Sequence, residues 1–134
     1  MAQAELRRNS VLFWLVFLIG AGIIFIGMRF LVAPLYGAAA FGVPAEGSPT
    51  MAFLWAKGTR DIVSGLVLFV FLGMRVDRRV IAAFIFVASL IPIADFINVF
   101  LNMGSHAVTA LMTHGGTAVF MIVLAAIIWR SVDR

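Results

Sequence analysis

The chain has 134 residues, of which 63% are hydrophobic and 12% are charged, and its mean hydropathy is +1.11. A soluble domain of this size cannot bury so much apolar surface, so the composition excludes an ordinary soluble enzyme and a disordered protein. It indicates an integral, multi-pass membrane protein. The net charge of +4 does not indicate nucleic-acid binding, because the arginines stand at the ends of apolar segments, and the absence of cysteine excludes disulfides and thiolate metal sites.

Four apolar segments approach the roughly 20 residues that a helix needs to cross the hydrocarbon core of a bilayer, which is about 30 Å thick. They are residues 10–31, 51–73, 80–101 and 107–129. The connections between the second and third segments and between the third and fourth are short, which makes these helices antiparallel neighbours. We therefore predict an all-α fold in which residues 1–134 form a single membrane-embedded four-helix bundle.

The first predicted span has no acidic residue and ends near Arg29. Residues 10–28 already cover about 28 Å at a rise of 1.5 Å per residue, so Arg29 is expected near the outer boundary of the membrane. The longer connection that follows, residues 31–50, contains three prolines and three glycines. It predicts either a short half-buried segment over the mouth of the bundle or an unstructured loop, and the sequence does not decide between the two.

The second predicted span contains Lys57, Arg60 and Asp61. Beyond Asp61, the apolar run of residues 62–74 covers only about 20 Å, which is too short to cross the hydrocarbon core. The three charged residues must therefore lie within the membrane. Their spacing of i, i+3 and i+4 places them on one face of the helix.

Asp95 in the third span and His114 in the fourth are placed by the same arithmetic. The apolar runs of residues 80–94 and 115–129 each cover about 22 Å, so both side chains also lie within the membrane. Because successive spans alternate in direction, all these runs start from the same face of the membrane, and the polar residues of three helices form one layer. Pro92, one turn before Asp95, is expected to kink the third span toward this layer.

The arginines indicate how the chain is oriented in the membrane. Seven of them fall on the same side of a four-span bundle, whereas the connections on the other side, residues 31–50 and 102–106, contain no Lys or Arg. The positive-inside rule therefore places both termini in the cytoplasm and the polar layer in the non-cytoplasmic half of the bundle. The seven are Arg7, Arg8, Arg75, Arg78, Arg79, Arg130 and Arg134.

Ionisable side chains inside a membrane are costly unless they pair with one another or line a polar cavity, so we expect the polar layer to form one internal pocket. The alternative is a buried ion pair of Arg60 with Asp61 or Asp95 that serves only to hold the helices together. For a functional pocket, the candidate catalytic residues are Asp95, Asp61, His114 and Arg60. The candidate substrate-binding residues are Lys57, Asn98, Arg29, Thr113 and Trp55.

The sequence indicates neither a metal site nor a cofactor. Two histidines, His106 and His114, are present, but no helix carries two metal-ligating residues at the spacing that a shared metal requires. A glycine-rich phosphate-binding loop is also missing from the sequence. We therefore expect the pocket to work without either.

Short motifs around these residues resemble a known family. They are Phe41-Gly42-Val43-Pro44, then Gly58-Thr59-Arg60-Asp61 followed by Gly65, then Asp95 and His114. With them the chain, from about Leu31 to Trp129, resembles the small four-helix membrane proteins grouped as domain-of-unknown-function family 4267. The resemblance supports Arg60, Asp61, Asp95 and His114 as the site, and it implies no activity.

Two classes of function fit the predicted pocket. The first is a cofactor-independent acid–base enzyme, such as an isomerase, a cyclase or an enzyme that opens epoxides, acting on a lipophilic small molecule. In such an enzyme Asp95 would be the acid or base, with Asp61 as its charged partner, Arg60 as an orienting group and His114 as a proton relay.

The second class is a proton-coupled transporter or a protein that binds membrane lipid or another small molecule. The cytoplasmic halves of the predicted spans are apolar, which favours a pocket over a path through a single chain. A homodimer is compatible with the sequence and would change that argument.

Overall fold

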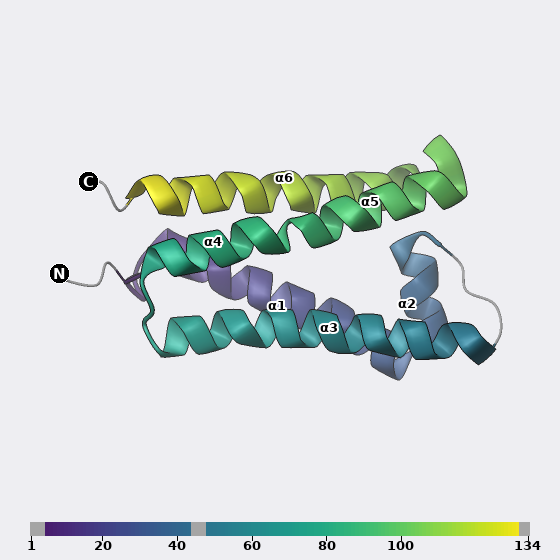
Figure 1. The fold of residues 1–134 in the computed structure, drawn as a ribbon, viewed down its shortest axis with the longest axis horizontal. Helices are drawn as coiled ribbons and strands as arrows, with labels where there is room; N and C mark the ends of the chain where they lie inside the picture. Colours follow the sequence, from purple (N-terminus) through teal and green to yellow (C-terminus); the bar gives the residue numbers. More distant parts are fainter. Residues whose placement is uncertain (1–4, 44–47, 132–134) are drawn as a thin grey trace.

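The structure is a computed structural model of the chain, and it describes residues 5–43 and 48–131. These residues form the helices α1 (Val11–Val32), α2 (Pro34–Phe41), α3 (Ser48–Gly73), α4 (Arg78–Ala88), α5 (Leu90–Met103) and α6 (Val108–Arg130), with a 3₁₀ turn, η1 (Gly104–His106), before α6 (Figure 1). In the described ranges the extended structure is limited to one isolated bridge between Glu5 and Asp77. The predicted all-α fold is confirmed.

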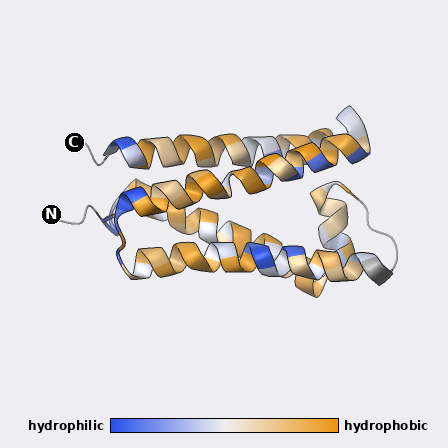
Figure 2. Cartoon of the chain, viewed as in Figure 1, coloured by the Kyte–Doolittle hydropathy of each residue, from blue (hydrophilic) through white to orange (hydrophobic). Residues whose placement is uncertain are grey.

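Three helical stretches of the described chain are long and apolar enough to cross a membrane. They are Val11–Val32, the combined stretch Arg78–His106, and Val108–Arg130. The 26-residue helix α3 has sufficient length but contains Lys57, Arg60 and Asp61. Figure 2 shows hydrophilic segments in the middle of this helix. The composition and these helices indicate a membrane protein, and a fourth crossing by α3 stays a prediction.

The long helices run along the long axis of the molecule, and the start of α1 and the end of α6 lie at one end together with the α3–α4 turn (Figure 1). We call this the terminal end. The opposite end carries α2 and the turn between α5 and α6, and we call it the α2 end. Helix α1 packs mainly against α3, while α6 packs against α4 and α5. The polar layer predicted from the sequence must therefore be assembled between these two groups of helices.

Glycines bring α1 and α3 into backbone contact. A Cβ atom built on Gly27 would lie 2.6 Å from the carbonyl oxygen of Gly58, and a Cβ atom on Gly65 would lie 2.6 Å from that of Gly20. Small residues let membrane helices approach this closely. On α3 the two glycines are seven residues apart, with Asp61 between them on the same face, so this contact turns Asp61 into the interior.

The terminal half of the bundle is filled by apolar side chains from all the long helices. Val16 of α1, Leu68 of α3, Ile81 and Ile85 of α4 and Ile128 of α6 are almost fully buried in one cluster. This cluster closes the bundle between the terminal end and the polar layer.

The third predicted span is two helices rather than one. Helix α4 ends at Ala88 and α5 begins at Leu90, and the hydroxyl of Ser89 donates a hydrogen bond to the carbonyl of Phe86 at 2.6 Å. Pro92 has no N–H to donate to the carbonyl of Ala88 four residues earlier, so the helical ladder is interrupted at this point. The interruption lies one turn before Asp95.

The connection after α1 contains an ordered helix, which is the first of the two alternatives for this segment. Pro34 stands at the start of α2, where a missing N–H is tolerated. Gly42 caps the end of α2 with φ +103°, a left-handed conformation that favours glycine. Gly37 and Ala38 of α2 are buried. Residues 44–47 of this connection lie outside the described ranges.

Candidate functional site

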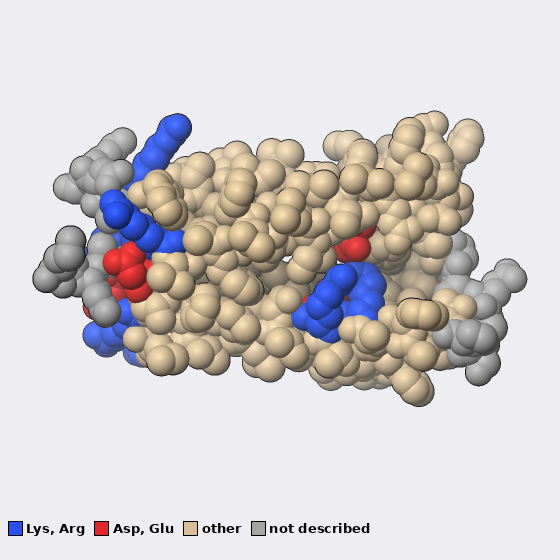
Figure 3. Space-filling view, in the orientation of Figure 1, with Lys and Arg blue, Asp and Glu red and all other residues tan. Residues whose placement is uncertain are grey.

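The charged residues of the described chain form two groups. One lies at the terminal end, and the other interrupts an otherwise uncharged surface closer to the α2 end (Figure 3). The second group, which we call the polar layer, contains Arg29, Lys57, Arg60, Asp61 and Asp95. The sequence prediction that these helices share one charged layer agrees with this arrangement.

Lys57 joins the two aspartates of the polar layer. Its Nζ atom donates hydrogen bonds to Oδ2 of Asp61 at 3.2 Å and to Oδ2 of Asp95 at 3.1 Å. The same ammonium lies 4.8 Å from the centre of the Phe41 ring and 5.2 Å from that of Phe30. Aromatic faces attract a cation, so the ammonium is held by two carboxylates and two rings. A carboxylate of α3 and one of α5 thereby share one lysine.

Arg60 holds the other side of Asp61. Its Nη2 and Nε atoms donate to Oδ1 of Asp61 at 3.0 Å and 3.2 Å. The Asp61 side chain is only 6% exposed, whereas that of Arg60 is 48% exposed. Both oxygens of Asp61 are therefore engaged by cationic side chains, which fix the carboxylate at the wall of the site.

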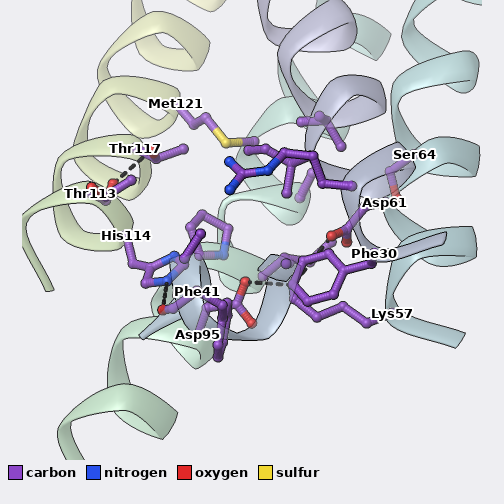
Figure 4. Close-up of a pocket in the computed structure, with 18 residues that line it drawn as sticks. Phe30, Phe41, Lys57, Asp61, Ser64, Asp95, Thr113, His114, Thr117 and Met121 are labelled. Atoms are coloured by element: carbon purple, nitrogen blue, oxygen red, sulfur yellow. Dashed lines mark hydrogen bonds and ion pairs between the residues drawn. The ribbon is translucent and has the colours of Figure 1, made fainter. Parts of the chain in front are cut away.

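A cavity of about 160 Å³ lies beside these ion pairs (Figure 4). Its polar lining comes from four helices and consists of Arg29, Lys57, Asp61, Ser64, Asp95, Thr113, His114 and Thr117. The rest of the lining is mostly apolar and includes Ile23, Ile26, Phe30, Phe41, Ile91 and Met121. An apolar cavity with a few convergent polar groups is the usual form of a small-molecule site.

His114 faces this cavity from α6 and is tied to the end of α2. Its Nε2 atom lies 3.0 Å from the carbonyl oxygen of Phe41, and the two rings are 4.7 Å apart. Because a carbonyl can only accept, Nε2 carries the hydrogen and donates it. In the neutral imidazole, Nδ1 then has the free lone pair and can accept a hydrogen bond from a ligand.

The carboxylate of Asp95 keeps one oxygen available. Oδ2 accepts the hydrogen bond from Lys57, and no donor of the described residues reaches Oδ1. Asp95 and His114 line the same cavity (Figure 4). A ligand can therefore meet a carboxylate oxygen from α5 and an imidazole from α6.

The predicted site residues fall into three groups by position. Asp95, Asp61, His114, Lys57, Arg29 and Thr113 line the cavity. Arg60 lies behind Asp61 and contacts it without lining the cavity. Asn98 and Trp55 lie elsewhere: Asn98 is exposed and accepts a hydrogen bond from Asn102 at 2.7 Å, and Trp55 is 53% exposed.

Sequence reasoning did not identify Phe30 and Phe41 as part of the site. Both rings pack on the ammonium of Lys57, and Phe41 also supplies the carbonyl that holds His114. The chain has 13 phenylalanines, and nothing in their spacing marks these two. Asn98 was predicted because it lies one turn from Asp95, but its side chain is exposed and pairs with Asn102 instead of lining the cavity.

A metal ion between the two aspartates would have to displace Lys57. The ammonium already occupies the point that both carboxylates share. Across the described ranges, no group of three or more Asp, Glu or His side chains is close enough to hold a metal.

Comparison with known proteins identifies one family. The model of the family described as a domain of unknown function (DUF4267) matches residues 20–128, a range that contains every residue of the polar layer. No curated protein and no solved structure matches the chain.

Proposed function

Since the chain belongs to the DUF4267 family, whose description states no function, we propose its function from the cavity itself. The protein is an integral membrane enzyme that carries out cofactor-independent acid–base chemistry on a lipophilic small molecule. The observation that supports this most is a mainly apolar cavity in which a carboxylate oxygen and an imidazole nitrogen are both available to a ligand. Paired proton-transfer groups in a desolvated site are what isomerisation or cyclisation requires.

The roles follow from the contacts of each side chain. Asp95 is the acid or base, because its Oδ1 is unoccupied and Lys57 stabilises its negative charge. His114 relays the proton through Nδ1, while its bond to Phe41 fixes the ring orientation. Asp61 holds Lys57 in place and offsets its charge, and Arg60 orients the Asp61 carboxylate from the other side. In an isomerisation, a proton leaves one carbon of the substrate for one of these groups and returns to another carbon.

Transport by a single chain is less well supported. A transporter needs access to its site from both faces of the membrane. The cluster around Ile85, Leu68 and Ile128 fills the bundle between the polar layer and the terminal end. This packing supports a pocket that is reached from one side, and it leaves binding without turnover as the simpler competing function.

Deuterium incorporation tests the proposed chemistry while the substrate is still unidentified. The purified protein is incubated in D₂O with an organic extract of the membranes that contained it, and mass spectrometry detects lipophilic molecules that gain deuterium. Catalysed proton transfer to carbon should introduce deuterium with the wild type. Asp95→Asn should keep the fold and lose at least about a hundredfold in rate, because general acid–base groups contribute on that order or more.

Asp77→Asn is the matched control for this experiment. Asp77 caps α4 at the terminal end, and an asparagine can cap a helix equally well. The control should therefore exchange as the wild type does. Equal exchange by wild type and Asp95→Asn, or no exchange by either, would contradict the proposed acid–base role.

A further inference from the structure

Arg29 is a cation that lines the cavity without a carboxylate partner among the described residues. It is half-buried near the end of α1, and its guanidinium lies 4.9 Å from the centre of the Tyr36 ring of α2. Within residues 5–43 and 48–131, no carboxylate oxygen lies within 4 Å of its nitrogens. Arginine does not lose its proton in proteins, so this positive charge persists at the wall of the cavity.

The charges of the polar layer do not balance. Three cations, Arg29, Lys57 and Arg60, face two carboxylates, Asp61 and Asp95. Asp61 has both oxygens engaged, and Asp95 is engaged by Lys57. Lys57 in turn is held by two carboxylates and two aromatic rings. The uncompensated positive charge therefore falls on Arg29, at the wall of the cavity.

We propose that the cavity takes an amphipathic anion, a molecule with an apolar body and one carboxylate or phosphate group, and that Arg29 binds this group. The inference rests on the proposed function and names its substrate class. Tyr36 covers a face of the guanidinium, which leaves the N–H groups at its edge to form paired hydrogen bonds with two oxygens of the anion. Ile23 and Ile26, on α1 beside Arg29, provide apolar surface for the body.

The excess positive charge at the cavity also favours an anionic ligand over a neutral one. An isolated cation in a region of low dielectric constant is costly, and an anionic ligand removes that cost on binding. The same anionic chemistry has two sources in a membrane: a free lipophilic acid, or the phosphate of a phospholipid.

Three probes with the same eight-carbon chain test the inference: octanoate, octyl phosphate and octanol. Their binding to the purified protein in an uncharged maltoside detergent is followed by the shift of the thermal unfolding midpoint. Octanoate or octyl phosphate should bind the wild type about tenfold or more tightly than octanol, which is the range expected for hydrogen bonds to a charged group. Arg29→Gln should remove this preference, and Arg29→Lys should restore part of it.

Arg130→Gln is the matched control, because Arg130 is an exposed arginine at the terminal end, far along the bundle from the cavity. It should keep the full preference for the anions. Mass spectrometry of molecules that co-purify with wild type and Arg29→Gln then identifies the source, since a free acid and a phospholipid have different masses.

Equal affinity for octanol and the two anions, or a preference that survives in Arg29→Gln, would overturn the inference. That result would not refute the proposed function, because a neutral substrate can still exchange deuterium in an Asp95-dependent manner. Conversely, an Arg29-dependent preference for anions without any deuterium exchange supports the anion site and refutes the enzyme.

Discussion

Lys57 contacts both carboxylates of the polar layer, at 3.1 Å and 3.2 Å, and packs against two aromatic rings. The short apolar run after Asp61 predicted that Lys57 lies inside the membrane, but the sequence did not show that Lys57 joins α3 to α5. Arg60 and Lys57 have equal formal charge and similar depth, and only the rotation of α3 decides which one points inward. The contact of Gly58 and Gly65 with α1 sets that rotation, and sequence spacing alone does not reveal which face α1 covers.

Replacement of the two cations should therefore have unequal effects on stability. Lys57→Met keeps the length of the side chain but leaves two carboxylates of the interior without their shared partner, and we expect it to lower the free energy of unfolding by about 3 kcal/mol or more. Arg60→Met should cost about 1 kcal/mol or less, because the Arg60 side chain is 48% exposed. Chemical unfolding of both variants in detergent measures the difference. An equal loss for the two would mean that Lys57 is not the buried bridge.

Helix α3 is positioned by its backbone contact with α1, and this contact places the site. Gly27 and Gly58 meet at the level of Lys57, and Gly20 and Gly65 meet one heptad away. The interruption between α4 and α5 has a comparable effect on Asp95. The sequence predicted a kink near Pro92, and the helices do separate just before it, at Ser89, where the serine hydroxyl bonds to the carbonyl of Phe86. The sequence could not distinguish helix α2 from an unstructured loop. The eight residues of α2 pack through Gly37 and Ala38 against surfaces that only the fold creates.

Two alanine substitutions on α1 test the glycine contact. In Gly27→Ala the new Cβ atom would lie 2.6 Å from the carbonyl oxygen of Gly58, so the helices must separate, and we expect a loss of about 1–3 kcal/mol. A Cβ atom on Gly22 would meet nothing within 4 Å, so Gly22→Ala should be neutral or slightly stabilising. Thermal unfolding midpoints in the same detergent compare the two variants. Equal midpoints would show that α1 and α3 are not in backbone contact.

For the whole molecule, the thickness of the bilayer was the most informative quantity in the sequence prediction. It placed Lys57, Asp61, Asp95 and His114 at one depth from three run lengths, and all four line one cavity. The same reasoning cannot give the contacts between side chains, because it fixes height along the bundle but not rotation about each helix. For that reason Asn98 and Trp55, which have suitable heights, lie outside the cavity, and Phe30 and Phe41 were missed.

The polar layer lies inside the membrane only if α3 crosses the membrane. Three stretches of the described chain are long and apolar enough to span, and α3 carries three charges in its interior. With four crossings, the segment before α1 and the connection between α5 and α6 lie on opposite sides of the membrane. With three crossings, in which α3 stays at one membrane surface, both of these segments lie on the same side of the membrane.

Cysteine labelling in intact cells distinguishes these cases, since the natural chain has no cysteine. Asn9→Cys and Ser105→Cys place a thiol at exposed positions before α1 and in η1. A membrane-impermeant maleimide should label Ser105→Cys in intact cells and label Asn9→Cys only after the membrane is opened, because the arginines place the N-terminus in the cytoplasm. Labelling of both thiols from the same side would show that α3 does not cross, and the polar layer would then lie at the membrane surface rather than within it.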